Sequence, residues 1–361
     1  MIEKAVAESA GQYVVRRALE LGFVSAGITD SSTPENYPSY QAWLDRGDHG
    51  TMSYMADPFH KKARSDMREL LPSVQSAIVV ALSYPKAMQA SEAPQGDTPD
   101  TGARGRIAQY ALGDDYHYLI KQKLRQLAVD LESFTGHPIE SRACVDSAPL
   151  LERELAERCG LGFIGKNTML ITPGVGSYFV LGVLLTDQEL STTQASRTHD
   201  CGSCTLCLDA CPTQAFRAPY KLNASKCISY LTIESREPVP HDLREAIGDR
   251  IFGCDECQSV CPYNGRAPLR QEIAAPMQAR SPDRSQPSLA MLAELGSNQR
   301  KRYVDRSPLR RNNREQLLRN VAIALQNADD LNDRDRSVLE QLQEDKSELV
   351  RSHAKGLGLT T

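Results

Sequence analysis

Eight of the ten cysteines lie between residues 201 and 261, and their spacing indicates a particular inorganic chemistry. The two runs read Cys201-x2-Cys204-x2-Cys207-x3-Cys211-Pro212 and Cys254-x2-Cys257-x3-Cys261-Pro262, with Cys227 between them. The first run matches the C-x2-C-x2-C-x3-C-P pattern of bacterial iron–sulfur proteins. Eight thiolates therefore predict two [4Fe–4S] clusters, which carry electrons one at a time.

The same pattern divides the cysteines into two groups of four. In two-cluster ferredoxins the first three cysteines of a run bind one cluster and the fourth binds the other. The second run lacks its first cysteine at the usual spacing, and Cys227 takes that place. We expect a first thiol set of Cys201, Cys204, Cys207 and Cys261, and a second thiol set of Cys211, Cys227, Cys254 and Cys257.

Zinc and disulfide bonds are the alternative uses of closely spaced cysteines. Structural zinc also uses Cys-x2-Cys pairs, but it rarely needs four cysteines within eleven residues before a proline. Disulfides require an oxidising compartment, whereas residues 1–5 begin no apolar signal segment. No apolar run approaches the roughly 18 residues of a membrane span. The sequence predicts a reduced, cytoplasmic protein, with Cys144 and Cys159 as small core residues.

A second candidate for chemistry is Asp146, which follows an expected strand and precedes an expected helix. Asp146 or Ser147 could be the N-cap of that helix, with Pro149 in its first turn. Alternatively, a carboxylic acid in a half-dry pocket can keep its proton at neutral pH and give it to a departing oxygen. The two roles are compatible, because a capping residue can also face a pocket.

Glycines follow Asp146 at an unusual density. The segment 160–167 resembles both a dinucleotide-binding motif and a phosphate loop, but Asn167 stands where the latter needs Ser or Thr. Both motifs require a strand before the glycines and a helix after them, and here a helix is expected first. We therefore expect no nucleotide site. Further glycines at 174, 176 and 182 would let backbone lie close to a flat, bulky cofactor, or would simply form turns.

The net charge of −4 argues against general binding of polyanions, but the basic residues are unevenly placed. Between residues 298 and 320 there are eight basic side chains and two acidic ones. Such a stripe is typical of a nucleic-acid contact or of a solvated helix face, and composition leaves both open.

The apolar pattern predicts the elements that would position these residues. We expect helices over 3–21, from 116 to 135 and over 150–159, and buried strands over 77–82, 141–145 and 178–185. Residues 87–105 are expected to form a loop and 274–288 a linker, and the chain is expected to be helical from residue 289. Helices that alternate with buried strands predict an α/β or α+β domain over 1–190.

Several segments together resemble the epoxyqueuosine reductase family. The resemblance rests on residues 145–153 (VDSAPLLER), 160–167 (GLGFIGKN) and 318–325 (LRNVAIAL), in addition to the cysteine runs. Residues 64–72 are similar to the family's R-x-D-P-R-x-L-L-P, with Met67 in place of proline, and Asp115-Tyr116-His117 is similar to its D-Y-H element. The likeness extends from about residue 10 to the C-terminus.

The resemblance implies an α+β fold in three parts. These are a nitroreductase-like cobalamin domain over 1–190, a ferredoxin-like two-cluster domain over 191–273 and a HEAT-like helical tail over 289–361 that binds tRNA. It also implies an activity, the reduction of epoxyqueuosine to queuosine in the anticodon loop of tRNA. Electrons would pass from an external low-potential donor through two [4Fe–4S] clusters to cobalamin.

The resemblance also implies roles for individual residues. Asp146 matches the family's proton donor. The expected cobalamin contacts are Arg64, Gly165, Lys166, Asn167, Gly176 and Ser177. The expected tRNA contacts within the basic stripe are Arg310, Arg311, Arg314 and Arg319.

The histidines provide a check on how cobalt would be held. Cobalamin enzymes that ligate cobalt through histidine often carry D-x-H-x-x-G, and no histidine here lies in that pattern. We expect cobalt not to be held through that motif. Two other functions remain open, a cobalamin-dependent reductive dehalogenase and a ferredoxin-like electron carrier. The former is typically exported with a twin-arginine signal, whereas Arg16-Arg17 lies inside an expected helix.

Overall fold

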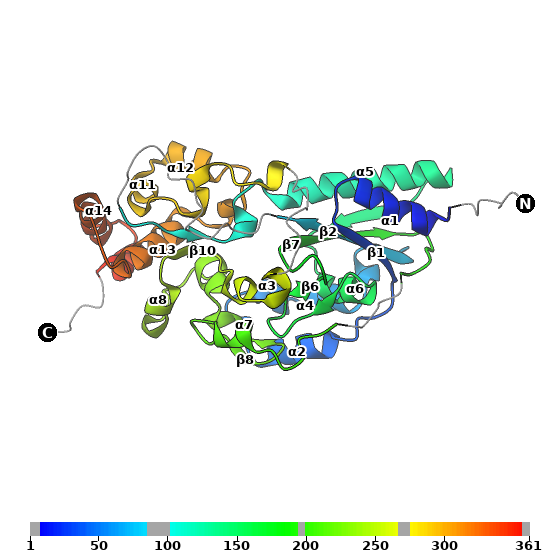
Figure 1. The fold of residues 1–361 in the computed structure, drawn as a ribbon, viewed down its shortest axis with the longest axis horizontal. Coiled ribbons are helices and arrows are strands. Elements are labelled where there is room, and N and C mark those ends of the chain that lie inside the picture. The colour runs from blue at the N-terminus through cyan, green and yellow to red at the C-terminus, as the bar shows by residue number, and fades with distance from the viewer. Residues whose placement is uncertain (1–7, 85–101, 194–198, 266–274, 356–361) are drawn as a thin grey trace, which may run out of the picture.

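A four-stranded antiparallel sheet lies at the centre of the N-terminal half of the chain (Figure 1). This computed structural model describes residues 8–84, 102–193, 199–265 and 275–355. The strand order is β1 (Ser25–Asp30), β2 (Ser76–Ser83), β7 (Phe179–Thr186) and β4 (Ser141–Cys144). The three predicted strands are therefore confirmed, and β1 is an edge strand that the sequence reading missed.

Both faces of the sheet are buried, which explains the continuous apolar run in β2. Successive side chains of a strand point to opposite faces. Accordingly Ile78, Val80 and Leu82 pack in one core, whereas the intervening Val79 packs in the other. Helices α1 (Ala10–Glu20) and α5 (Tyr116–Thr135) cover the first face, and α6 (Glu152–Arg158) covers the second (Figure 1).

The ends of these helices follow local capping chemistry. Helix α1 begins at Ala10, because Ser9 and Gln12 form a reciprocal capping box. The predicted start at residue 3 is therefore too early by several residues, and residues 3–7 lie outside the described part of the chain. Helix α5 begins after Asp115 and ends at Gly136, whose backbone is left-handed, as predicted. The predicted loop over 87–105 lies outside the described residues except for 102–105.

The cluster segment consists of short elements that lie below the sheet in Figure 1. Its helices and strands are α7 (Leu206–Asp209), β8 (Phe216–Ala218), β9 (Lys221–Leu222), the π-helix η5 (Tyr230–Glu234), α8 (His241–Ile247), β10 (Arg250–Phe252), α9 (Glu256–Ser259) and α10 (Pro262–Gly265). Helices α2 (Tyr37–Asp45), α3 (Ser53–Ala56) and α4 (Pro58–Ser65) flank it. The Trp43 indole N–H donates to the Leu222 carbonyl at 2.8 Å, which ties α2 to β9.

The tail is helical, as predicted. It contains α11 (Leu289–Glu294), α12 (Ser297–Val304), α13 (Arg314–Gln326), α14 (Asp333–Gln343) and α15 (Glu348–Ala354). Helix α13 is its buried centre. Residues 103–112 pack in the same core, and β3 (Arg106–Ile107) pairs with β10. The expected boundary at residue 190 therefore does not separate the hydrophobic cores, although the functional domain ranges stay a prediction.

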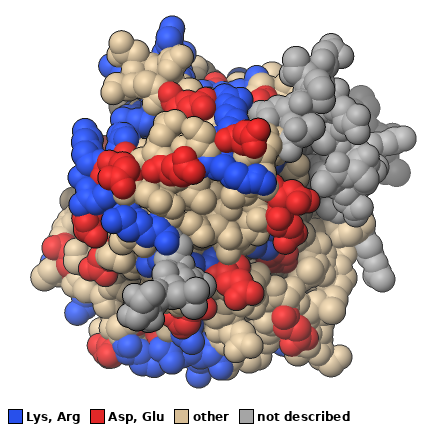
Figure 2. Space-filling view, turned by 90° about the vertical axis from the view of Figure 1, so that its left-hand side faces the viewer, with Lys and Arg blue, Asp and Glu red and all other residues tan. Residues whose placement is uncertain are grey.

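The segment expected to be a linker contains two short 3-10 helices, Ala275–Met277 and Pro282–Ser285. Met277 is buried in the core beside α5, so the segment packs against the sheet domain. Figure 2, which views the left-hand end of Figure 1, shows basic and acidic side chains interspersed. Within the described residues, no helix combines the length and apolarity required to cross a membrane.

Replacing Leu124 by Ala should destabilise the sheet domain. Leu124 is fully buried where α5 packs on β7, and removal of a buried leucine side chain costs about 2–5 kcal/mol. Chemical unfolding of the full chain measures the effect. Val129→Ala on the same helix is the matched control, because Val129 is 56% exposed and should change the free energy of unfolding by less than about 0.5 kcal/mol. Equal effects of the two substitutions would contradict this account of the core.

Candidate active site and cluster centres

The first thiol set lies together in the structure. Burial raises the pKa of the Cys207 thiol, and the nearby thiols of Cys201, Cys261 and Cys204 raise it further. Burial also raises the pKa of Cys261, with Cys201 and Cys204 again contributing. Because charges interact appreciably only over short distances, these shifts indicate that the four thiols lie near one another. Within the described residues, no group of three or more His, Cys, Asp or Glu side chains is arranged to hold a single metal ion.

The second thiol set is grouped in the same way. Burial raises the pKa of Cys257 well above its usual value, and Cys227, Cys254, Cys207 and Cys211 raise it further. The influence of Cys207, a member of the first thiol set, shows that the two groups are adjacent. Helix α7, which carries Cys207, and helix α9, which carries Cys257, also contact each other.

The surroundings of the thiols suit iron–sulfur ligation. All eight are half-buried and free of disulfide bonds. Backbone N–H groups donate to Cys201 Sγ from Lys166, at 3.4 Å, and to Cys211 Sγ from Ala215, at 3.3 Å. Such bonds stabilise the thiolate form, which is the form that binds metal.

A cavity separates the sheet domain from the cluster segment. Its volume is about 360 Å³, which lies within the range of ligand pockets. Its walls include Tyr84, Tyr110, Tyr116, Arg153, Asn167, Thr168, Met169, Phe179, Cys211, Cys227, Cys254, Asp255, Cys257 and Gln258. All four sulfurs of the second thiol set therefore border a space suited to a bulky flat cofactor.

Asp146 lies between β4 and α6, beside the first turn of α5. Its Oδ2 accepts a hydrogen bond from the Tyr116 hydroxyl, at 3.0 Å, and lies 3.3 Å from His117 Nε2. Its backbone N–H donates to Glu152 Oε1 at 2.7 Å, which holds the residue at a strained φ of 49°. The N-cap of α6 is Leu151, so the capping roles considered for Asp146 and Ser147 are wrong.

The protonation of this group differs from the expectation for a half-dry acid. Burial acts to raise the pKa of Asp146, but hydrogen bonds from His117 and Tyr116 outweigh it, and the pKa lies below its usual value. Burial acts to lower the pKa of His117, but hydrogen bonds to Asp115 and Asp146 raise it to about 9. At neutral pH Asp146 is therefore ionised and His117 carries the proton.

Glu152 is a second proton-bearing group. Burial and the charge of Asp146 raise its pKa to about 8. In the sequence, Glu152 and His117 stand out only as members of segments that resemble the family, with no role of their own. Their proximity to Asp146 arises from the packing of α5 and α6 on the sheet, which no local pattern reveals.

The predicted cobalamin contacts fall in different places. Asn167 lines the cavity, and its side-chain N–H donates to the Cys257 carbonyl at 3.1 Å. Lys166 contacts the loop of the first thiol set. Ser177 bonds to Asn264 and Gln258 in the cluster segment, and a side chain at Gly176 would collide with Asn264.

Arg64 is buried away from the residues that line the cavity. Its guanidinium lies 5.2 Å from the centre of the Tyr40 ring, and it donates to the His60 carbonyl at 3.3 Å. The contact with Tyr40 joins α4 to α2, so Arg64 has a structural explanation that does not involve cobalamin.

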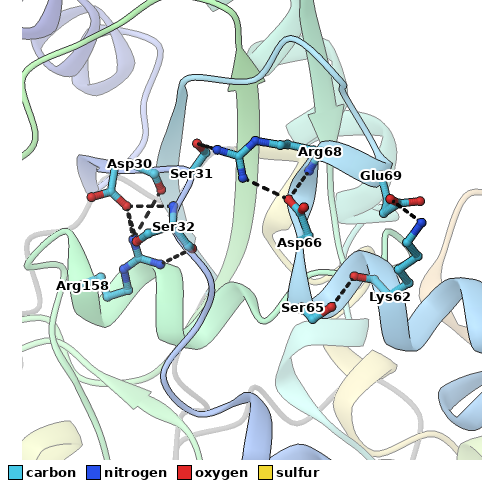
Figure 3. Close-up of polar contacts among 9 residues, drawn as sticks. All are labelled: Asp30, Ser31, Ser32, Lys62, Ser65, Asp66, Arg68, Glu69 and Arg158. Atoms are coloured by element: carbon cyan, nitrogen blue, oxygen red, sulfur yellow. Dashed lines mark hydrogen bonds and ion pairs between the residues drawn. The ribbon is translucent and has the colours of Figure 1, made fainter.

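The polar residues that follow Arg64 form a surface network (Figure 3). Asp66 accepts from the Arg68 backbone N–H at 2.9 Å, and Arg68 donates to Ser31 Oγ at 3.2 Å. Arg158 of α6 bonds to Asp30 at the end of β1. The network connects α4, β1 and α6 on the side of the sheet domain.

The four arginines expected to bind tRNA occupy different environments. Arg310 is exposed and donates to the Tyr118 hydroxyl at 2.9 Å. Arg311 forms two hydrogen bonds to the Glu234 carboxylate, and its charge lowers the pKa of Asp146, so it lies near that site. Arg314 is half-buried and paired with Asp345.

Arg319 does not fit the expected role. It is fully buried in α13, and burial lowers its pKa to about 10. Its guanidinium donates to the carbonyls of Leu231, Ser235 and Glu237. The prediction of a tRNA contact at Arg319 is therefore wrong, because its donors are used inside the protein.

Two family descriptions match separate parts of the chain. Residues 64–147 match "Epoxyqueuosine reductase QueG, DUF1730", which covers Arg64 and Asp146. Residues 200–264 match "4Fe-4S double cluster binding domain", which covers all eight cysteines of the two sets. The chain therefore carries a double-cluster [4Fe–4S] domain.

Known proteins are similar over nearly the whole length. The epoxyqueuosine reductase of Pseudomonas aeruginosa is 42% identical, and the alignment covers 93% of this chain and 90% of that protein. A crystal structure of epoxyqueuosine reductase with a tRNA-Tyr epoxyqueuosine-modified stem loop superposes with a TM-score of 0.79 at 31% identity, covering 95% of this chain and 88% of that one. The Streptococcus thermophilus enzyme gives a TM-score of 0.80 at 29% identity, covering 95% and 87%. This chain belongs to the epoxyqueuosine reductase family.

Proposed function

We propose that this oxidoreductase reduces epoxyqueuosine in tRNA to queuosine, with electrons supplied through two [4Fe–4S] clusters and cobalamin. The observation that supports this best is the single cavity with the second thiol set on one wall and Tyr116, which bonds to Asp146, on another. The thiols proposed to supply electrons and the tyrosine bonded to the proposed proton donor therefore border the same cavity. A reductive dehalogenase or a simple electron carrier would leave family membership unexplained.

The cavity is the proposed cobalamin site. Its aromatic lining and its opening to solvent suit a large planar ring, and Asn167 is the predicted contact that lies on its wall. Bound cobalamin would supply the two-electron reducing chemistry that opens the epoxide. The second thiol set would hold the cluster next to the cofactor, and the first thiol set would hold the cluster that receives electrons from an external low-potential donor.

Asp146 is the proposed proton donor to the epoxide oxygen, and His117 is its source of protons. The carboxylate by itself is ionised at neutral pH, so it must receive the proton before it can deliver it. His117 Nε2 lies 3.3 Å from Asp146 Oδ2, and His117 Nδ1 is held by Asp115 at 2.7 Å. The contact between Nδ1 and Asp115 fixes the ring so that the Nε2–H of His117 points at Asp146.

The remaining parts have proposed roles. We assign cobalamin binding to a nitroreductase-like domain over 1–190, cluster binding to a ferredoxin-like domain over 191–273 and tRNA binding to a HEAT-like tail over 289–361. Arg310 and Arg311 are the proposed phosphate contacts, because both lie close to the Asp146 site. The free thiols suit a reducing compartment such as the cytoplasm.

Asp146→Asn should lower anaerobic turnover of epoxyqueuosine tRNA by about 10²- to 10⁴-fold, the usual contribution of a general acid. Cluster absorbance and tRNA affinity should be unchanged, since the amide preserves the shape of the side chain. Asp66→Asn, in the surface network of Figure 3, is the matched control and should retain turnover. Near-normal turnover by Asp146→Asn would exclude the acid role, and no turnover by the wild-type protein with cobalamin and reductant would exclude the proposed reaction.

The rate should depend on pH through His117. Its pKa is raised to about 9, so the imidazolium is present below that pH and turnover should fall as pH rises through about 9. In His117→Gln this fall should disappear and turnover should be low throughout. Glu152, with a pKa of about 8, titrates nearby, and Glu152→Gln distinguishes the two because it should leave the fall near pH 9 in place. A fall that persists in His117→Gln would contradict the relay.

Arg310→Gln and Arg311→Gln should each weaken tRNA binding and reduce the slope of log affinity against log salt concentration by about 1. Each removes one proposed phosphate contact. Filter binding or fluorescence anisotropy over a range of salt concentrations measures the slope. Arg336→Gln, an exposed arginine of α14, should leave it unchanged. Unaltered slopes in both test variants would show that these arginines belong to a solvated face.

A further inference from the structure

A lysine of the sheet domain reaches into the loop that carries the first thiol set. Lys166 lies in the turn between β5 (Phe163–Ile164) and β6 (Leu170–Ile171). Its Nζ donates to the carbonyl oxygens of Gly202, at 2.7 Å, and Cys204, at 2.9 Å. Its backbone N–H donates to Cys201 Sγ at 3.4 Å. One residue therefore makes three hydrogen bonds to the stretch 201–204.

These contacts hold the ammonium group in place. One carbonyl belongs to Gly202, which lies between two cysteines of the first thiol set, and the other belongs to Cys204, a member of that set. The charge therefore cannot move away from the loop without breaking two hydrogen bonds. The Lys166 carbonyl in turn accepts from the Tyr220 backbone N–H at 3.0 Å. The lysine is thus fixed from both sides, by the cysteine loop and by the chain before β9.

A fixed positive charge has a definite effect on a cluster. Reduction adds one negative charge to the cluster, so a nearby cation stabilises the reduced form more than the oxidised form. Hydrogen bonds to ligand sulfur act in the same direction, and both are known determinants of cluster potential. Lys166 supplies the cation through its side chain and the hydrogen bond through its backbone.

Two acidic residues beside this loop act in the opposite direction, and one of them, Asp200, bonds to the same stretch as Lys166. Asp200 accepts from the Gly202 backbone N–H at 2.7 Å, and Asp209 accepts from the Thr205 hydroxyl at 2.7 Å. Among the described residues, Lys166 is the cation hydrogen-bonded to the stretch 201–204. Substituting Lys166 therefore measures its contribution to the electrostatic potential at the first thiol set, apart from that of the acidic residues.

We propose that Lys166 raises the reduction potential of the cluster bound by the first thiol set, so that this cluster accepts electrons readily from the external donor. This inference rests on the two-cluster part of the proposed function. It assigns to Lys166, which resembled a phosphate-loop lysine in the sequence, an electrostatic role toward a cluster. Its effect on the second cluster is smaller, since its hydrogen bonds are to the other loop.

The test is an anaerobic redox titration of the full-length protein, followed by electron paramagnetic resonance. In Lys166→Gln, which retains hydrogen-bond donors but no charge, the ratio of reduced to oxidised first cluster at a fixed potential should fall about tenfold, a shift of about 59 mV for one electron. The second cluster should keep its wild-type ratio. Cys204→Ser, which removes a ligand of the first thiol set, identifies the signal of that cluster.

Two further variants sharpen the result. Lys166→Arg keeps the charge and should stay within about twofold of the wild-type ratio. Lys221→Gln removes an exposed charge from neighbouring β9 and should also change the ratio less than about twofold.

Unchanged potentials in Lys166→Gln would overturn the proposal. Loss of iron from the first cluster in that variant would also overturn it, because the lysine would then be a structural clamp. The titration requires neither cobalamin nor tRNA, so its failure is distinguishable from failure of the proposed reductase activity.

Discussion

The relation between the cluster segment and the cavity depends on a buried hydrogen-bond network around Ser177. The Ser177 backbone N–H donates to Asn264 Oδ1 at 2.7 Å, and its hydroxyl donates to Gln258 Oε1 at 3.0 Å. Asn264 also donates to the Gln258 carbonyl at 2.7 Å. A satisfied buried network fixes one arrangement, because any displacement leaves polar groups unpaired. Gly176 permits the close approach, since it has a φ of 90° and a side chain there would meet Asn264. Cys257, the residue before Gln258, is thereby held against the cavity.

The tail is joined to the cluster segment by a buried charge. Arg319 lies at the centre of α13 and donates to carbonyls of the π-helix η5 and the residues that follow it. Its neighbour Asn320 donates to the carbonyls of Thr232 and Ile251. Since buried donors without acceptors are costly, the tail and the cluster segment constrain each other. The same tail places Arg310 and Arg311 near Asp146, so a helical region far along the chain contributes to the mouth of the site.

Sequence reasoning was most successful where the chemistry is local. The cysteine spacing predicted a double [4Fe–4S] domain, which the family match over residues 200–264 confirms, and the apolar run of residues 77–82 predicted the central strand β2. The division of the thiols into two sets of four stays a prediction. Sequence reasoning failed where distant segments meet. In the sequence Arg319 is one more member of the basic stripe, and only the packing of α13 against η5 shows that it is buried. The family resemblance implied cobalamin contacts at Lys166 and Ser177, and the structure pairs these residues with positions 202, 204, 258 and 264 of the cluster segment. No periodicity links positions that are so far apart in the chain.

The electrostatics of Asp146 show why a single residue does not suffice for proton delivery. Desolvation alone would raise the pKa of the Asp146 carboxyl, but Asp146 accepts hydrogen bonds from Tyr116 and His117, which stabilise its charge. The same contacts raise the pKa of His117, so the proton rests on the imidazole and the carboxylate remains ready to accept it. A negatively charged oxygen that develops on a bound epoxide would attract that proton through Asp146. In the proposed reaction the donor is therefore a pair of residues, Asp146 after β4 and His117 in α5, which the sheet brings together.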